Sequence, residues 1–231
     1  MDRNQKIFLG AFIFGIFSVL FIWFGEPAFV SRITREDGEV ENLTAVFYLI
    51  AFILCLLSFV KDRKFYLALI WVFLCFVFLG EETSWFQRLF KYSVPTIEEM
   101  NAQDEFNIHN LDVFQGGGIL GDSFSFSSLL KSQNLFRLGF FGYFLILPLL
   151  NLIPKIKNIL KKIRYVSPDK RFIICLLIVF VLSFALAPYV EPKVKSALAE
   201  TREMLYSFFI FIYVLSYIYV GKNSKQSHAT V

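Results

Sequence analysis

The sequence predicts an all-α fold, a polytopic membrane helix bundle with about six transmembrane helices. Of its 231 residues, 56% are hydrophobic and 30 are Phe, whereas an ordinary soluble domain is about 45 to 50% apolar. The apolar residues form long runs, and each run that crosses a bilayer must be a helix, because an isolated strand in lipid would leave its backbone groups unpaired.

Each predicted span is an apolar run of roughly the 20 residues that a helix needs to cross the hydrocarbon core. The six runs cover about 6–25, 43–60, 65–82, 135–153, 171–190 and 203–220. The first is as long as a full span and no Ala-x-Ala cleavage site follows it, so we expect it to be a helix rather than a removed signal.

A single transmembrane domain over 1–221 is therefore expected. The segment 83–134 forms its outer loop, and 222–231 forms a disordered cytoplasmic tail. At some 50 residues the loop is long for a structureless connection, so we expect an amphipathic helix in it that lies on the outer face and caps the bundle. The three cysteines all lie inside apolar runs and offer no spaced metal or disulfide framework.

Charged residues are divided unevenly between the two sides of these spans. If the termini and the loops 61–64 and 154–171 share one side, that side carries fourteen basic residues and three acids, and the other carries nine basic residues and sixteen acids. The positive-inside rule then makes both termini cytoplasmic. Topology also accounts for the lysines of 154–171, which otherwise fit an anionic-lipid or nucleic-acid patch, and no nucleic-acid partner is expected.

The outer side collects three acidic elements, of which the first is the start of the second span. Glu41, Thr44 and Tyr48 follow one another at helical spacing, and an acid at a helix N-terminus is favoured by the helix dipole. Glu41 is therefore a secondary site candidate, and the alternative is that it only begins the helix.

The second element is the end of the third span, where Glu81 and Glu82 follow an apolar run. Two adjacent carboxylates in an apolar setting repel each other, so we expect a raised pKa on at least one or a bound cation. If the helix continues to Phe90, Glu81, Ser84 and Arg88 share a stripe, with an ion pair between Glu81 and Arg88 as the purely structural alternative. Glu82 would then face the side of Trp85.

The third element is a helix expected from about Ile97 to Phe114, which a capping-box pattern begins. Glu105 and His109, four residues apart, form a tentative site for a divalent metal, or else an acid and histidine pair. The alternative without a functional role is that His109 is simply exposed to solvent. Further candidates for contact with a substrate are the amide side chains before, within and after this pair: Gln87, Asn101, Gln103, Asn107 and Asn110.

The last span is expected to begin early, because Pro192 suits the first turn of a helix that then runs continuously into it. On that helix Glu200, Glu203 and Ser207 lie at spacings of three and four, and Arg202 lies on another face. The two acids are secondary candidates, and the alternative is the solvated end of a long helix.

The outer motifs resemble those of an uncharacterised group of bacterial multi-pass membrane proteins. Its motifs are E-D-G-x-x-E-x-x-T, G-E-E-x-S-W-x-Q-R and N-x-Q-x-E-x-N-x-H-N, which begin here at Glu36, Gly80 and Asn101. The resemblance implies a six-span protein of the inner (plasma) membrane, and it implies no activity. A weaker similarity is to the Glu-Glu-x-x-x-Arg motif of CAAX-type intramembrane endopeptidases. Glu82 and Arg88 are six residues apart rather than four, and that family's two histidine motifs are missing.

These candidates favour a membrane-embedded hydrolase or transferase that acts on a lipid or lipid-linked substrate at the outer leaflet. Glu81 or Glu82 would be the general base, His109 and Glu105 would bind metal or serve as acid, and Arg88 would hold an anionic group. One alternative is a cation-coupled transporter, although Arg137 and Asn151 are nearly the only charged or amide residues inside the runs. Another is a non-catalytic scaffold or sensor whose outer helix binds a partner.

Overall fold

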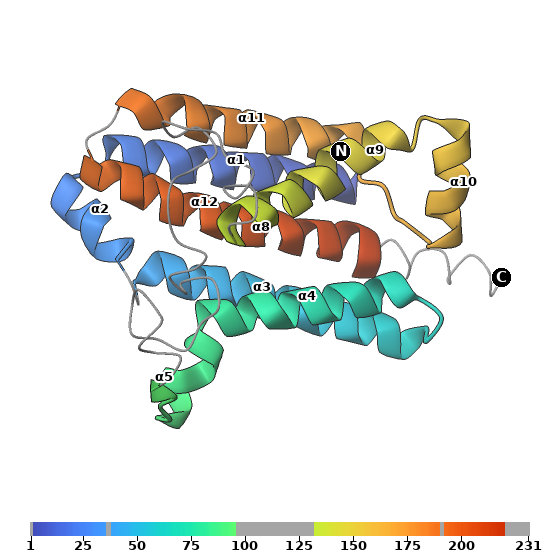
Figure 1. Ribbon diagram of the computed structural model, residues 1–231. Helices are drawn as coiled ribbons and strands as arrows, with labels where there is room; N and C mark the ends of the chain where they lie inside the picture. Colours follow the sequence, from blue (N-terminus) through green and yellow to red (C-terminus); the bar gives the residue numbers. More distant parts are fainter. Residues whose placement is uncertain (1, 36–37, 96–131, 190–191, 220–231) are drawn as a thin grey trace. The chain divides into compact units, whose positions relative to one another are not determined.

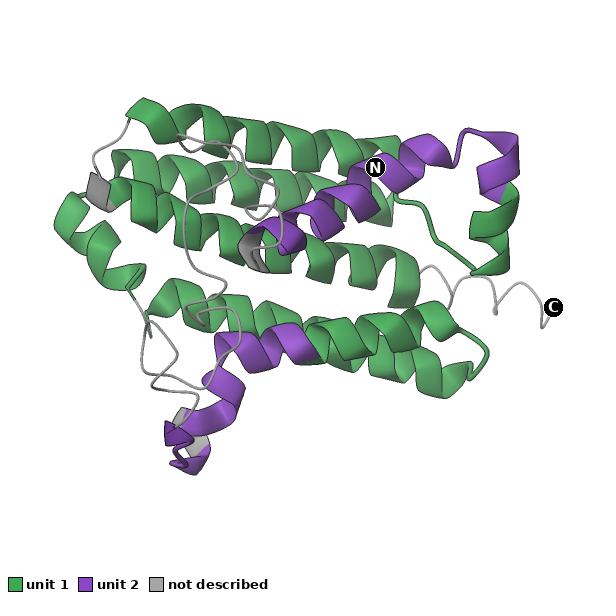
Figure 2. Ribbon diagram, viewed as in Figure 1, with its two compact units in different colours: residues 1–76, 158–231 green, residues 77–157 purple. Residues whose placement is uncertain are grey.

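The computed structural model describes residues 2–35, 38–95, 132–189 and 192–219, and every regular element in these ranges is a helix (Figure 1). The predicted all-α class is therefore confirmed. The chain divides into two compact units, shown in Figure 2: one comprises 1–76 and 158–231, the other 77–157. The outer helix expected at 97–114 and the tail at 222–231 lie outside the described residues, and the single membrane domain stays a prediction.

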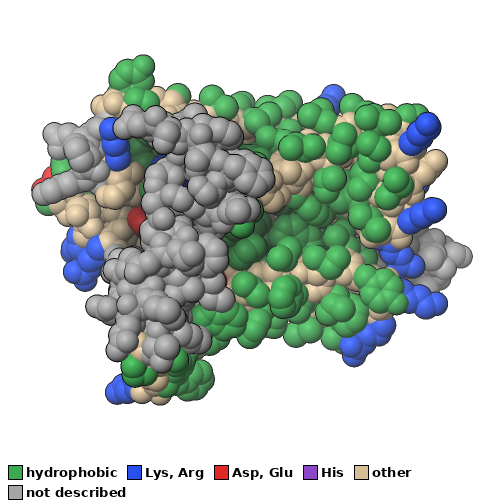
Figure 3. All heavy atoms as spheres, in the orientation of Figure 1, with side chains coloured by type: hydrophobic (Ala, Val, Ile, Leu, Met, Phe, Trp, Pro, Cys, Tyr) green, Lys and Arg blue, Asp and Glu red, His purple; other side chains and the backbone are tan. Residues whose placement is uncertain are grey.

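Three helices among the described residues are long and apolar enough to cross a membrane: α1 (Arg3–Phe24), α3 (Glu39–Lys61), and α11 (Lys170–Leu186) with the 3-10 turn that extends it to Tyr189. At about 1.5 Å per residue, the 22 residues of α1 extend roughly 33 Å, which matches a hydrocarbon core of about 30 Å. Large apolar side chains such as Phe17 and Val181 are exposed along these helices, as expected of surfaces that face lipid. Figure 3 shows this apolar surface, with basic side chains gathered toward its ends.

The predicted spans at 65–82, 135–153 and 203–220 are also helical, but they are not among the described helices that are long and apolar enough to cross a membrane. The helix α4 (Tyr66–Glu82) has 17 residues. The run expected at 135–153 is a shorter apolar helix, Asn134–Leu150, which the structure divides into α8 (Ser132–Phe141), the π-helix η3 (Gly142–Ile146) and α9 (Leu147–Leu150). The three apolar helices are consistent with a membrane protein, whereas six spans stay a proposal.

The helix α12 (Pro192–Tyr213) is the centre of the first unit. It begins at Pro192, as predicted, and continues into the π-helix η5 (Val214–Tyr219). It packs against α1, α3 and the short helix α2 (Pro27–Ile33), and all side chains from Met204 to Ile210 are buried. This burial on all sides explains why its pattern shows no single apolar face.

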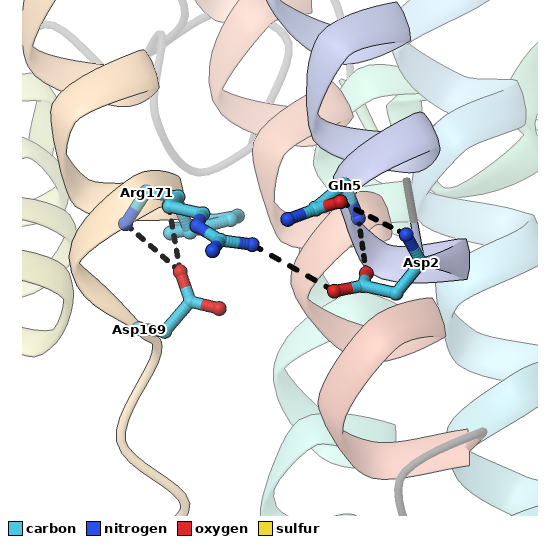
Figure 4. A network of polar contacts seen from close by, with 5 residues as sticks. Asp2, Gln5, Asp169 and Arg171 are labelled. Atoms are coloured by element: carbon cyan, nitrogen blue, oxygen red, sulfur yellow. Dashed lines mark hydrogen bonds and ion pairs between the residues drawn. The ribbon is translucent and has the colours of Figure 1, made fainter.

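The arrangement around α12 is fixed by close packing and by helix caps. Gly15 of α1 lies against Val179 of α11, where a Cβ would come within 2.8 Å of a valine methyl group, so the two helices approach closely. Asp2 caps α1 and Asp169 caps α11 by accepting bonds from backbone N–H groups, and Arg171 pairs with Asp2 at 3.7 Å (Figure 4). These caps tie the N-terminal ends of both helices together.

The remaining described helices are short. They are η1 (Ser84–Phe86), α5 (Gln87–Phe90), α10 (Pro154–Lys162) and η4 (Ala187–Tyr189). The helix α2 was not anticipated, although Pro27 at its first position is a recognisable start signal. Its Val30 packs with Ile22 of α1 and with Val194 and Leu198 of α12, which closes the end of the first unit opposite the N-terminus.

Candidate functional site

The chain makes an abrupt turn directly after Glu82. Ser84, Trp85 and Phe86 have φ values of 45°, 52° and 65°, so three successive residues other than glycine adopt left-handed backbone. Such a conformation costs roughly 1–2 kcal/mol for each residue with a side chain. Strained backbone of this kind persists only where surrounding contacts enforce it, and it is concentrated at functional sites.

Contacts from both sides hold this turn in place. The indole Nε1 of Trp85 donates a hydrogen bond to Glu81 Oε1 at 2.6 Å, and the hydroxyl of Tyr92 donates to the backbone oxygen of Trp85 at 2.9 Å. The ring of Trp85 lies directly over Gly80, where an added Cβ would be 2.9 Å from it. Thr83 donates through its hydroxyl to the backbone oxygen of Leu79 and so closes the last turn of α4.

The turn gives a physical reason for most of the G-E-E-x-S-W pattern. Gly80 makes room for the indole, the indole orients the Glu81 carboxylate, and Ser84 is buried at 2% exposure inside the turn. A hydrogen bond to a carboxylate is stronger than one between neutral groups, so Glu81 is fixed in direction. Glu82, the last residue of α4, is half-buried.

The helix does not continue from Glu82 to Phe90: α4 ends at Glu82, where the span predicted at 65–82 also ended. The left-handed residues end α4 and start α5 in a new direction, so Glu81, Ser84 and Arg88 do not share one helical stripe. The indole of Trp85 donates a hydrogen bond to Glu81. Gln87 begins α5 and is half-buried, whereas the side chain of Arg88, and with it an ion pair to Glu81, lies outside what the structure describes.

A second group of polar residues lies in the first unit, on α3 and α12. Thr44 and Tyr48 of α3 are 1% and 3% exposed, and Ser207 of α12 is fully buried. The faces of α3 and α12 that carry the predicted polar stripes therefore point into the protein at Thr44, Tyr48 and Ser207. Glu41, at the start of the first stripe, and Glu203, within the second, are half-buried.

Aromatic packing fixes how α3 and α12, which carry these two polar stripes, are aligned along their axes. Phe47 of α3 contacts Phe208 and Phe211 of α12, with ring centroids 5.1 Å and 5.8 Å apart, and the two helices run in the same direction (Figure 1). Counting six residues back along both helices places Glu41 at the height of Arg202 to Leu205. Glu41 and Glu203 thus lie at one level of the first unit.

Arg202 lies at this same level, next to α11. Its guanidinium carbon lies 4.8 Å from the centroid of the Phe184 ring. One turn further along α12, Tyr206 stacks on Phe180 at 4.6 Å. Ser183, between these two phenylalanines in sequence, is fully buried. Glu200, three residues before Glu203 on the same helix, is half-buried.

The predicted candidates are thus divided between the two units. Glu81, Glu82 and Gln87 belong to 77–157, and Glu41, Glu200 and Glu203 belong to the other unit. Among the described residues no group of three His, Cys, Asp or Glu side chains is placed to hold a metal ion. The predicted metal pair and the amide candidates lie outside the described residues: Asn101, Gln103, Glu105, Asn107, His109 and Asn110.

Comparison with protein-family models, with curated proteins and with solved structures found no match.

Two features of the turn were not identified from the sequence. Tyr92 supports Trp85 from seven residues away across two changes of chain direction, and no periodic pattern signals such a contact. The role of Gly80 had a weak signal, since a glycine directly before two acids at a helix end indicates that a side chain or backbone approaches closely.

Proposed function

We propose that this chain is a six-span inner-membrane protein with both termini in the cytoplasm, and that it is a hydrolase or transferase acting on a lipid or lipid-linked substrate at the outer face. The observation that supports this most is the Gly80–Phe86 turn. It maintains three left-handed residues and directs a carboxylate by an indole N–H, at the end of an apolar helix. A fold that keeps such strain there has a use for the geometry.

The turn suggests separate roles for the two acids. The indole N–H occupies one oxygen of Glu81, which makes Glu81 the anchor of the site. We therefore assign proton transfer from an attacking water or hydroxyl to Glu82. A general base of this kind contributes roughly 10²–10⁴-fold to the rate.

The remaining roles follow the sequence motifs. Arg88 would hold an anionic group of the substrate, as guanidinium groups do for phosphates. Glu105 and His109 would bind a divalent metal or supply the acid. The amide residues would contact polar groups of the substrate: Gln87, Asn101, Gln103, Asn107 and Asn110.

The transporter alternative receives less support, because several hydroxyls of the described helices are satisfied within their own helix, although those of Ser183 and Ser216 are buried without a hydrogen-bond partner among the described residues. Ser18, Thr44, Ser58 and Thr201 each donate to the backbone oxygen four residues earlier. Hydroxyls engaged in this way do not form a continuous polar path.

A matched pair of variants tests the enzymatic proposal. Protein reconstituted in nanodiscs is incubated with polyprenyl-phosphate-linked and phospholipid substrates, and products are measured by mass spectrometry. Glu82→Gln is expected to lower turnover about 100-fold or more, while Glu39→Gln, an exposed acid in the first turn of α3, leaves it unchanged. Turnover in Glu82→Gln within twofold of wild type would refute the assignment and favour a non-catalytic scaffold or sensor. Metal content measured in the same samples tests Glu105 and His109 as ligands.

A further inference from the structure

The helix α10 combines a lysine-rich face with an apolar face that the protein covers only in part. At 100° per residue, Ile159 and Leu160, with Ile163 directly after the last helical residue, gather on one side of this helix and Lys161 and Lys162 on the other. Leu160 is buried at 6% exposure, but Ile159 and Ile163 are 60% and 58% exposed. Both lysines are exposed.

The end of α10 is fixed to the first unit. Arg164 adopts left-handed backbone, with φ of 55°, and the N–H of Tyr165 donates to the backbone oxygen of Leu160 at 2.9 Å, which is the pattern of a Schellman cap. Arg164 in turn pairs with Asp62, in the α3–α4 connection, at 3.7 Å. The exposure of the two isoleucines is therefore a property of a helix held in place.

The second half of α10, Asn158–Lys162, belongs to the unit that contains α1 and α11, and it lies across the direction of those spans at their N-terminal ends (Figures 1 and 2). A helix that lies across the ends of spans and carries apolar and basic faces has the geometry of an interfacial helix. Its apolar half then enters the boundary of the acyl chains, and its lysines reach the headgroups.

The surroundings of α10 reinforce the positive charge. The acids at this end are already engaged: Asp62 pairs with Arg164, Asp2 pairs with Arg171, and Asp169 caps α11. Within the described residues, Lys161 and Lys162 form no ion pair. Further exposed basic side chains of the same unit lie on the segments that meet at this end: Arg3, Lys6, Lys61, Arg63, Lys64 and Lys170.

We propose that α10 is a binding surface for anionic phospholipids of the bilayer in which the chain is embedded. Ile159 and Ile163 insert among the acyl chains, and Lys161 and Lys162 bind headgroup phosphates. The exposed isoleucines distinguish this partner from a nucleic acid or a soluble phosphate, neither of which would cover apolar surface. The proposal is independent of the enzymatic one, because it concerns other residues.

Lipid selectivity tests the lysines. Purified full-length protein is titrated with phosphatidylglycerol or phosphatidylcholine, and retained lipids are counted by native mass spectrometry. Wild type should retain phosphatidylglycerol preferentially, and Lys161→Gln/Lys162→Gln should reduce this preference about tenfold, since each basic residue near a headgroup contributes substantially. Lys195→Gln, which replaces an exposed lysine near the start of α12, should leave the preference for phosphatidylglycerol unchanged. An unchanged preference in the double variant, an equal loss in Lys195→Gln, or competition by soluble glycerol phosphate would each overturn the proposal.

Insertion is tested with a fluorescent label. Cys55, Cys75 and Cys175 are buried and so protected from labelling in the folded protein. A polarity-sensitive dye on Ile159→Cys should shift its emission to the blue in phosphatidylglycerol vesicles and be quenched by brominated acyl chains. The same dye on Asn158→Cys, one residue away on the lysine face, should show neither effect. Equal responses from the two positions would contradict insertion.

Discussion

Gly80→Ala should disrupt the turn that carries Glu81. The new Cβ would lie 2.9 Å from Cδ2 and Cε3 of Trp85, whereas carbon atoms prefer about 3.5–4.0 Å. The indole must therefore move by about 0.6 to 1 Å. Such a movement would stretch the 2.6 Å bond between Trp85 and Glu81 to the limit of hydrogen bonding.

The expected loss of stability in Gly80→Ala has two parts. Overpacking of this kind costs typically 1–3 kcal/mol, and a weakened hydrogen bond to a charged group adds about 1 kcal/mol, below the 1.5–3 kcal/mol of a complete loss. We therefore expect the free energy of unfolding to fall by about 2–4 kcal/mol.

Chemical unfolding in mixed micelles, followed by near-ultraviolet circular dichroism of the tryptophans, measures this change. The matched control is Gly139→Ala in α8, where nothing lies within 4 Å of the added methyl group. Since alanine favours a helix interior over glycine, this control should be neutral or stabilised by up to about 1 kcal/mol. If Gly80→Ala unfolds at the same denaturant concentration as the control, the close approach of the indole to Gly80 is refuted.

Three further changes test the packing and caps. Gly15→Ala should lower the midpoint of thermal unfolding, because its Cβ would come within 2.8 Å of Val179, and adding Val179→Ala should restore part of the loss; a double variant below both single variants would contradict this. Asp169→Ala removes a side chain that accepts from two backbone N–H groups of α11, so it should cost about 1 kcal/mol in the same chemical unfolding assay, and an unchanged midpoint would show that the cap contributes nothing. Tyr92→Phe removes the donor to the backbone oxygen of Trp85 and should cost about 1 kcal/mol, with a change in the tryptophan circular dichroism that Tyr66→Phe, at an exposed tyrosine, does not produce.

The long helices could be predicted because their signals are local. The run expected at 171–190 is helical over 170–189, and the last helix begins at Pro192 as its proline indicated. The length of an apolar run and a proline at the first turn depend only on neighbouring residues, so both can be recognised in a single sequence.

The turn after Glu82 could not be predicted for the opposite reason. Ser84, Trp85 and Phe86 are not glycines, and nothing in their propensities favours left-handed backbone. Their conformation depends on contacts with Gly80 and Tyr92, which the sequence does not pair. Helical periodicity alone therefore left open a helix continuing to Phe90, in which Trp85 would lie on the side of Glu82.

The position of α12 has a consequence for how the protein is made. This helix leaves the ribosome after α1, α2 and α3, yet it fills the space against which they pack. The earlier helices cannot complete their packing during synthesis, and they must remain inserted as separate segments until Pro192–Tyr213 has been released. Assembly of the first unit is thus completed only once α12 has been synthesised, and this helix closes the structure from within.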